Sequence, residues 1–237
     1  MIYALDFDGV ICDSIHECFH NTYQAFRLVR PELDLPSEPK TLWRKKFFEH
    51  RGLVRPARNF YLLWNLIVSN HQIGKSTIEF ESDATNYEHI LILFDEEFMS
   101  IREEQLKSDL QAFLIQNPLF PAVKELWGDL PRPIYIVTAK DERITRLILE
   151  YNGLNVDGVF GKGTGHKYQT LLRLAKSHDV AVSSVYFVDD NPEFVREADS
   201  IGVKTALSNW GYGPYGPEHG KSLDSFEQVL GFFNNEQ

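Results

Sequence analysis

From Pro133 onward the chain alternates short apolar runs with segments that look helical, and this alternation is the strongest constraint on its fold. Four of the apolar runs are predicted to be strands, at residues 134–137, 159–160, 185–188 and 203–207. The segments between them are predicted to be helices, at residues 141–150, 167–177 and 192–201. Such alternation predicts an α/β fold, in which a parallel sheet carries helices on both faces.

A separate strand is predicted at the start of the chain, where residues 1–5 form an apolar run. Residues 15–118 look helical instead and show no clear strand alternation. They contain an apolar stripe from Ile15 to Phe26 with Ser14 as its expected N-cap, a buried helix over 60–68, and one long helix or two over 86–116. The simplest topology is therefore a sheet domain with a helical insertion after its first strand.

Composition narrows the function classes. The 237 residues carry a net charge of −10, which disfavours general affinity for nucleic acid. The two cysteines, Cys12 and Cys18, fit a reducing compartment better than a disulfide scaffold. The N-terminus lacks the basic region of a signal peptide, and no apolar run approaches the ~20 residues that a membrane helix needs. We therefore expect a soluble cytoplasmic protein without a membrane or nucleic-acid partner.

Two aspartates, Asp6 and Asp8, follow the first apolar run in the string DFDGV. Carboxylates two positions apart on a strand point to the same side, and two like charges so close need a cation or a shared proton. The pair implies either a bound metal or a nucleophile beside an acid/base. A calcium-binding EF-hand loop is excluded, because its fifth and sixth positions would be Val10 and Ile11.

Polar residues also follow two of the later predicted strands. Thr138 comes after the run at 134–137, and Asp189, Asp190 and Asn191 come after the run at 185–188. Parallel strands place their carboxyl ends at one edge of the sheet, so these groups should converge there with the first two aspartates. Magnesium suits such a set of carboxylates. Taken alone, Thr138 could instead cap a helix, and Asp189–Pro192 could be an ordinary turn.

Four sequence features in this order resemble a known family. The strings DFDGVICDS, IVTAK and VDDNP, together with a lysine at the start of a helix before the last of them, are similar to the motifs of the haloacid-dehalogenase-like (HAD) hydrolases. The phosphoglycolate-phosphatase-like branch, which carries a helical cap after the first motif, is the most similar. The resemblance implies a Rossmann-like core of residues 1–14 and 119–237, with 15–118 as the cap.

The resemblance also implies a role for each motif residue. Asp6 would be the nucleophile that forms an aspartyl-phosphate, and Asp8 the acid and base. Thr138 and the neighbouring Ala139 would bind the phosphoryl group. Magnesium would be held by the carboxylates of Asp6, Asp189 and Asp190 and by the backbone carbonyl of Asp8, with the choice between Asp189 and Asp190 as the direct ligand left open.

A lysine is expected to neutralise the phosphoryl group, and three candidates exist. Lys167 opens a predicted helix 22 positions before Asp189, which suits the family spacing, so we assign the catalytic and phosphate-binding role to it. Lys140 is expected at the surface. Lys162 is expected in a loop whose glycines resemble a phosphate cradle but lack the full Walker spacing.

Two further segments have open roles. Residues 40–58 carry seven positive charges and one negative charge, which form either a solvated face or a grip on an anionic substrate. The aromatic residues among them are expected to form the cap's own core. Residues 209–217 are too rich in glycine and proline for regular structure and are expected to line the entrance of the site.

The sequence thus predicts a magnesium-dependent phosphatase for a small phosphorylated metabolite. A haloacid dehalogenase would not need the second acid, Asp8, or a metal. A phosphomutase would keep the same residues, and a catalytically silent binding protein on this core is the non-enzymatic alternative. The identity of the substrate and the oligomeric state are not encoded in any motif.

Overall fold

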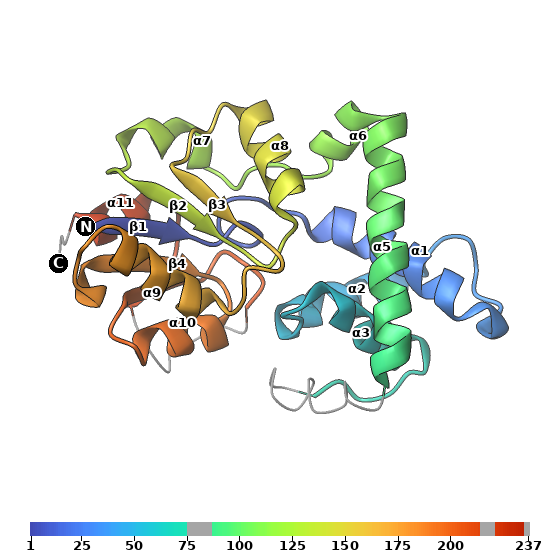
Figure 1. The fold of residues 1–237 in the computed structure, drawn as a ribbon. Coiled ribbons are helices and arrows are strands. Elements are labelled where there is room, and N and C mark those ends of the chain that lie inside the picture. The colour runs from blue at the N-terminus through green and yellow to red at the C-terminus, as the bar shows by residue number, and fades with distance from the viewer. Residues whose placement is uncertain (75–86, 214–220, 235–237) are drawn as a thin grey trace. The chain divides into compact units, whose positions relative to one another are not determined.

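The computed structural model describes residues 1–74, 87–213 and 221–234. Its contacts divide the chain into two compact units. We call residues 1–13 and 118–237 the core unit, and residues 14–117 the insert unit. Figure 1 shows the strands gathered in the core unit, whereas the regular elements among the described residues of the insert unit are helices.

The core unit is built on one sheet of six parallel strands. In chain order these are β1 (Ile2–Leu5), β2 (Ile134–Val137), β3 (Gly158–Phe160), β4 (Val185–Asp189), β5 (Lys204–Ser208) and β6 (Lys221–Leu223). Their order across the sheet is β3-β2-β1-β4-β5-β6, and every neighbouring pair is parallel. The predicted α/β class and parallel sheet are confirmed. The order runs outward in both directions from β1, so the carboxyl end of β1 lies at the point where ligands usually bind.

Helices cover both faces of this sheet (Figure 1). The core helices are α7 (Val123–Leu126), α8 (Glu142–Asn152), α9 (Lys167–Ser177), α10 (Pro192–Asp199) and α11 (Glu227–Phe233), with short 3-10 turns at Trp127–Asp129 and Val182–Ser184. The helices predicted at 141–150, 167–177 and 192–201 correspond to α8, α9 and α10. The sequence analysis did not anticipate β6 or α11.

Alternation along β1 divides its side chains between the two faces. Ile2 and Ala4 pack in a cluster with Leu171 of α9 and Ala198 of α10. Tyr3 points to the other face, where its ring lies 4.8 Å from that of Phe233 in α11. The strand is therefore buried on both sides, which explains why it reads as a continuous apolar run.

Within the core unit, the segment that leads into the insert unit (residues 11–13) is hydrogen-bonded to the segment that returns from it (residues 118–120). The backbone N–H of Asp13 donates to the carbonyl of Pro118 at 2.8 Å, and that of Phe120 donates to the carbonyl of Ile11 at 2.9 Å. Cys12 and Leu119 form an isolated antiparallel bridge between them. The outgoing and returning chains thus pair like a short two-stranded ribbon.

The insert unit consists of helices α1 (Ile15–Val29), α2 (Thr41–His50), α3 (Phe60–Val68), α5 (Glu88–Ser108) and α6 (Leu110–Ile115), with 3-10 turns at Pro31–Leu33, Arg51–Leu53 and Ala57–Asn59. The helix predicted over residues 60–68 is confirmed, because α3 begins and ends at those residues. The stretch predicted over 86–116 forms two helices, although its first residue lies outside the described range. Ser14 precedes α1 as predicted but its hydroxyl does not cap the helix; it lies 3.7 Å from Cys18 Sγ.

Aromatic side chains fill the interior of the insert unit. Trp43, Phe47, Phe60 and Trp64 are all buried, and the rings of Phe47 and Phe60 stack at 5.4 Å. The expectation that these residues form the unit's own core is confirmed. Of the seven basic residues at 40–58, Lys40, Arg44, Lys45 and Arg58 are exposed and the other three are partly buried.

A buried ion pair joins the two longest helices of the insert unit. Arg102 of α5 donates to both carboxylate oxygens of Glu17 of α1, at 2.8 and 2.7 Å. Their side chains are 4% and 0% exposed. Asn21 and Gln105 exchange two amide hydrogen bonds of 2.8 Å beside the pair, and Asn21 also donates to Glu17. This polar network lies within an otherwise apolar packing, so each of its charges depends on its partner.

In the parts of the chain that the structure describes, no helix combines the length and apolar character that crossing a membrane requires.

Candidate active site

The predicted site residues lie at the carboxyl ends of the three central strands. Asp6 directly follows β1, Thr138 directly follows β2, and Asp189 is the last residue of β4. The backbone N–H of Asp6 still donates to Val188 of β4 at 2.9 Å, so it continues the strand pairing by one residue. The topology therefore brings together residues that are far apart in the sequence.

Three aspartates form a buried acidic cluster there. Asp6, Asp189 and Asp190 each offer one carboxylate oxygen, and these atoms all lie within 4.8 Å of one another. Their exposed fractions are 6%, 0% and 7%. Burial raises the pKa of Asp189 well above its usual range, and the charges of Asp6 and Asp190 add to this effect, while the nearby Lys167 opposes it.

Lys167 lies between two of these carboxylates. It is the first residue of α9, and its Nζ is 2.8 Å from Asp6 Oδ2 and 2.8 Å from Asp189 Oδ2. Burial alone would lower the pKa of Lys167, but the carboxylates of Asp189 and Asp6 outweigh it and raise this pKa above its usual range. The lysine therefore remains an ammonium, and the structure places it at the position that the sequence analysis favoured.

Asp8 has a different cationic partner. Lys140 Nζ lies 3.1 Å from Asp8 Oδ1 and 3.3 Å from Asp8 Oδ2. The expectation that Lys140 is a surface residue is wrong, because its side chain is only 1% exposed. Residues next to strand ends can turn inward, and the apolar pattern of β2 does not show which way they turn. Lys162, the third candidate, is exposed.

Thr138 and Ala139 lead from β2 into α8. Thr138 is buried, its backbone N–H donates to Phe160 at 2.9 Å, and its hydroxyl accepts from the N–H of Lys140 at 3.2 Å. Ala139 is partly buried. Thr138 is not the helix cap, since Asp141 takes that role by accepting from Ile144 N–H at 3.0 Å. The hydroxyl of Thr138 thus remains available to the site.

The string Asp189–Pro192 combines a structural and a site role. Asn191 caps α10, because its side chain accepts from the N–H of Glu193 at 3.0 Å, and Pro192 takes the first helical position. The two aspartates are directed to the acidic cluster instead. Asp189 Oδ1 also accepts the N–H of Asn191 at 2.8 Å, so the interpretation as an ordinary turn holds in part, and the aspartates contribute to the cluster as well.

Three glycines surround Asp190 closely. A Cβ added to Gly9 would lie 2.3 Å from Asp190 Oδ2, and one added to Gly211 would lie 2.4 Å from Asp190 Cβ. A Cβ added to Gly213 would lie 1.9 Å from the carbonyl oxygen of Asp190. Between the last two, the N–H of Tyr212 donates to Asp190 Oδ2 at 2.7 Å. The loop after β5 thus fixes an acidic site residue.

The sequence analysis did not foresee this function of the loop. It expected residues 209–217 to line the entrance, and residues 214–217 lie outside the described range. Trp210 and Tyr212 bind the turn after β1: the indole N–H donates to Val10 carbonyl at 3.1 Å and the phenol donates to Asp13 Oδ1 at 2.9 Å. Gly211 and Gly213, on either side of Tyr212, were the sequence signal that could have indicated a close approach of this loop to another segment.

The residues present fit a divalent cation. Their donors are carboxylate oxygens, which are the hard ligands that magnesium prefers. Asp6 and Asp189 share the ammonium of Lys167, so these two carboxylates together exceed its charge and leave negative charge for a cation to balance. The absence of a Cβ at the three glycines lets their backbone approach Asp190 closely and so fixes this carboxylate in the cluster.

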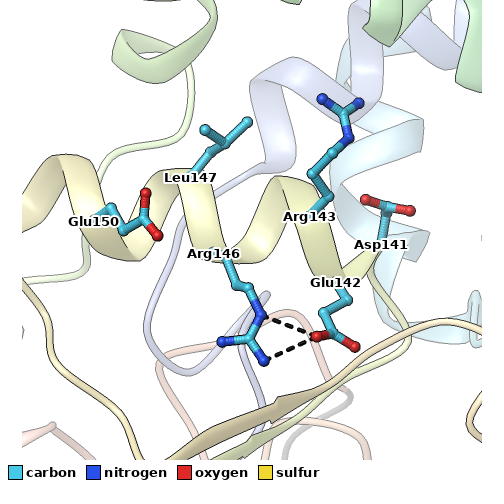
Figure 2. Close-up of a pocket in the computed structure, with 6 residues that line it drawn as sticks. All are labelled: Asp141, Glu142, Arg143, Arg146, Leu147 and Glu150. Atoms are coloured by element: carbon cyan, nitrogen blue, oxygen red, sulfur yellow. Dashed lines mark hydrogen bonds and ion pairs between the residues drawn. The ribbon is translucent and has the colours of Figure 1, made fainter.

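A surface depression elsewhere in the core unit has a different character (Figure 2). Its lining comes from α8 and its N-cap alone: Asp141, Glu142, Arg143, Arg146, Leu147 and Glu150. Arg146 pairs with Glu142 at 2.9 Å across it. None of the aspartates or lysines of the candidate site lines this depression, so it does not compete as the catalytic centre.

Comparisons with known proteins support the fold. No protein-family model matches the sequence, and no curated protein matches it. Solved structures do match over nearly the whole chain. A haloacid dehalogenase-like hydrolase from Streptococcus pneumoniae is 18% identical with a TM-score of 0.63, covering 98% of this chain and 97% of its own.

Two further structures are similar. A predicted phosphoglycolate phosphatase from Haemophilus somnus is 15% identical with a TM-score of 0.66, covering 97% of this chain and 96% of its own. A predicted phosphatase from Clostridium acetobutylicum is 13% identical with a TM-score of 0.67, covering 99% and 98%. At these identities the likeness establishes the fold, which confirms the predicted resemblance at that level: the chain has the fold of the haloacid-dehalogenase-like hydrolases.

Proposed function

We propose that this protein is a magnesium-dependent phosphatase that hydrolyses a small phosphate monoester through an aspartyl-phosphate on Asp6. The observation that carries the proposal is the pairing of Asp6 with the Lys167 ammonium at 2.8 Å, next to two further buried aspartates. A carboxylate held beside a cation is suited to attack a phosphoryl group whose negative charge must be neutralised. Similar structures described as phosphatases support the same reaction class.

In the first step an oxygen of Asp6 forms a bond to phosphorus, and the bond from phosphorus to the leaving oxygen breaks. Asp8 gives a proton to that leaving oxygen, and Lys167 and Thr138 bind the phosphoryl oxygens. In the second step Asp8 takes a proton from water as the water oxygen attacks phosphorus. The bond between phosphorus and Asp6 breaks, and its electron pair returns to the carboxylate. Asp6 and Asp8 are then restored.

Asp6, Asp189, Asp190 and the backbone carbonyl of Asp8 would hold the magnesium ion. When bound, the ion supplies positive charge to the phosphoryl group and to the acidic cluster. Ala139, beside Thr138, would contribute its backbone N–H to the phosphoryl oxygens. The insert unit would act as the cap that excludes water and selects the substrate. Its basic stretch at residues 40–58 would then either contact the anionic substrate through one or two side chains or form a solvated face.

Two alternatives remain distinct from this proposal. A phosphomutase would use the same residues and return the phosphoryl group to a second hydroxyl instead of water. A silent binding protein would retain the fold without turnover. Phosphate release separates both from a phosphatase, because a mutase yields an isomer and a binding protein yields no product.

Removal of magnesium is the direct test. Phosphate release from p-nitrophenyl phosphate should require added magnesium, fall to background with excess chelator and return when magnesium is restored, because the acidic cluster cannot bind an anionic substrate without a cation. Calcium serves as the control ion, since its larger size and looser geometry suit the site poorly. Chelator-resistant phosphate release would contradict the proposed role of the cluster.

A second prediction concerns the space beside Asp190. Gly9→Ala should raise the magnesium concentration needed for half-maximal activity by about tenfold, because its Cβ would overlap the Asp190 carboxylate. Gly202→Ala is the matched control, since Gly202 has a similar positive φ of 89° and no atom near its added Cβ. Equal effects of the two substitutions would assign the loss to backbone strain rather than to Asp190.

A further inference from the structure

Lys140, like Lys167, is buried, and both its backbone and its side chain make contacts although the sequence-based assignment gave it no role. Its backbone N–H donates to the Thr138 hydroxyl at 3.2 Å, and its carbonyl accepts from the N–H of Lys162 at 2.8 Å. A Cβ on Gly161 would lie 2.7 Å from that carbonyl, so the next loop packs directly against it. Both backbone groups of Lys140 are thus fixed by neighbouring segments.

Its side chain contacts the second aspartate of the first motif. Lys140 Nζ lies 3.1 and 3.3 Å from the two oxygens of Asp8, so it spans the carboxylate rather than one atom of it. The lysine side chain is 1% exposed and that of Asp8 is 15% exposed. A contact shielded from solvent on the lysine side is weakened little by salt or by side-chain motion.

Lys167 and Lys140 each contact an aspartate of the first motif. Lys167 lies 2.8 Å from Asp6 and 2.8 Å from Asp189, and Lys140 lies 3.1 Å from Asp8. A lysine whose only task was phosphate binding would need no fixed link to the acid/base. The geometry of Lys140 instead matches a group that controls the orientation of the Asp8 carboxylate and stabilises its negative charge.

We propose that Lys140 is a positioning residue for Asp8 in the leaving-group step. This inference rests on the proposed phosphatase function and deepens it. As Asp8 transfers its proton to the leaving oxygen, the bond from that oxygen to phosphorus breaks, and Asp8 is left as a carboxylate. The ammonium of Lys140, already in contact with both carboxylate oxygens, stabilises that anion and holds it in line with the leaving oxygen.

The consequence is a dependence on the leaving group. p-Nitrophenolate is a stable anion that departs without a proton, whereas unsubstituted phenolate is more basic and benefits from one. The two phenyl phosphates have similar shapes, so they bind alike and differ in their need for Asp8. Lys140→Met should lower kcat/KM for phenyl phosphate by about 100-fold and that for p-nitrophenyl phosphate by less than about tenfold.

A double-mutant cycle isolates the path through Asp8. Asp8→Asn should show the same preference for the better leaving group, and the double variant Asp8→Asn/Lys140→Met should be no slower on phenyl phosphate than Asp8→Asn alone. Lys176→Met, which removes an exposed lysine at the end of α9, is the matched control and should change neither substrate. Urea midpoints of all variants establish that the compared proteins are folded.

The outcomes separate the two proposals. Equal losses on both substrates, or additive losses in the double variant, would overturn the role of Lys140 and assign it to phosphate binding or to packing. If the wild-type protein hydrolyses neither phenyl phosphate nor p-nitrophenyl phosphate, the proposed function is overturned, and the role of Lys140 with it. Wild-type activity on both substrates with Lys140→Met equal to Lys176→Met would overturn this inference alone.

Discussion

Replacement of Asp6 by asparagine is expected to lower phosphate release by about 10⁴-fold or more, because an amide oxygen cannot form the aspartyl-phosphate. The side chain keeps its shape, and its oxygen can still accept the N–H of Phe7, which donates to Asp6 Oδ1 at 2.7 Å. The substitution also removes one charge from a crowded acidic cluster. We therefore expect the loss of activity without a loss of stability.

One measurement and one control variant make this test specific. Acid-quenched wild-type protein should carry one phosphoryl group, detected by mass spectrometry on the peptide that contains Asp6, and Asp6→Asn should carry none. Asp199→Asn, an exposed position at the end of α10, controls for the change of charge. Turnover that survives Asp6→Asn would mean that another group is the nucleophile.

The largest effect on stability is expected in the insert unit. Arg102→Met should lower the free energy of unfolding by about 3–5 kcal/mol, because it leaves the Glu17 carboxylate buried without its bidentate partner. Urea denaturation measures this loss. Since the Glu17 carboxylate is fully buried, water cannot readily replace the guanidinium.

Compensation distinguishes a lost partner from lost packing. The double variant Glu17→Met/Arg102→Met should recover most of the stability, because no charge then remains buried. The control is Lys45→Met, which breaks an exposed ion pair with Glu49 at 3.7 Å and should change the free energy of unfolding by at most about 0.5 kcal/mol. Arg102 also places its guanidinium carbon 3.9 Å from the centroid of the Phe98 ring, and a double variant as unstable as Arg102→Met would show that the arginine acts through that contact.

The sequence was sufficient for features that depend on local patterns. The apolar runs of β1, β2 and β4 required burial on both faces, and a parallel sheet then determined where Asp6, Thr138 and Asp189 would meet. Lys167 was favoured because it opens a predicted helix 22 positions before Asp189, a spacing that suits the family resemblance. The three-residue strand β6 and helix α11 were missed because short segments carry little periodicity.

The role of Lys140 depended on tertiary structure instead. Its long side chain can point to solvent or fold back under the sheet edge, and both are compatible with the string IVTAK. Only the positions of Thr138, Gly161 and Lys162, which fix its backbone, and of Asp8, which receives its ammonium, settle the direction. The same holds for the loop around Asp190, whose glycines are explained by contacts with residues from two other segments.

The ribbon formed by residues 11–13 and 118–120 has a consequence for how this chain tolerates change. The hydrogen bond between Asp13 and Pro118 holds the two ends of the insertion next to each other. The pairing of the sheet strands therefore does not depend on the length of chain between these two residues. The entropic cost of closing such a loop grows by only about 0.6 kcal/mol for each doubling of its length. The insert unit can therefore lengthen, shorten or be exchanged in evolution with little effect on the sheet edge that holds the acidic cluster, and under the proposed function substrate choice could diverge while the chemistry stays fixed.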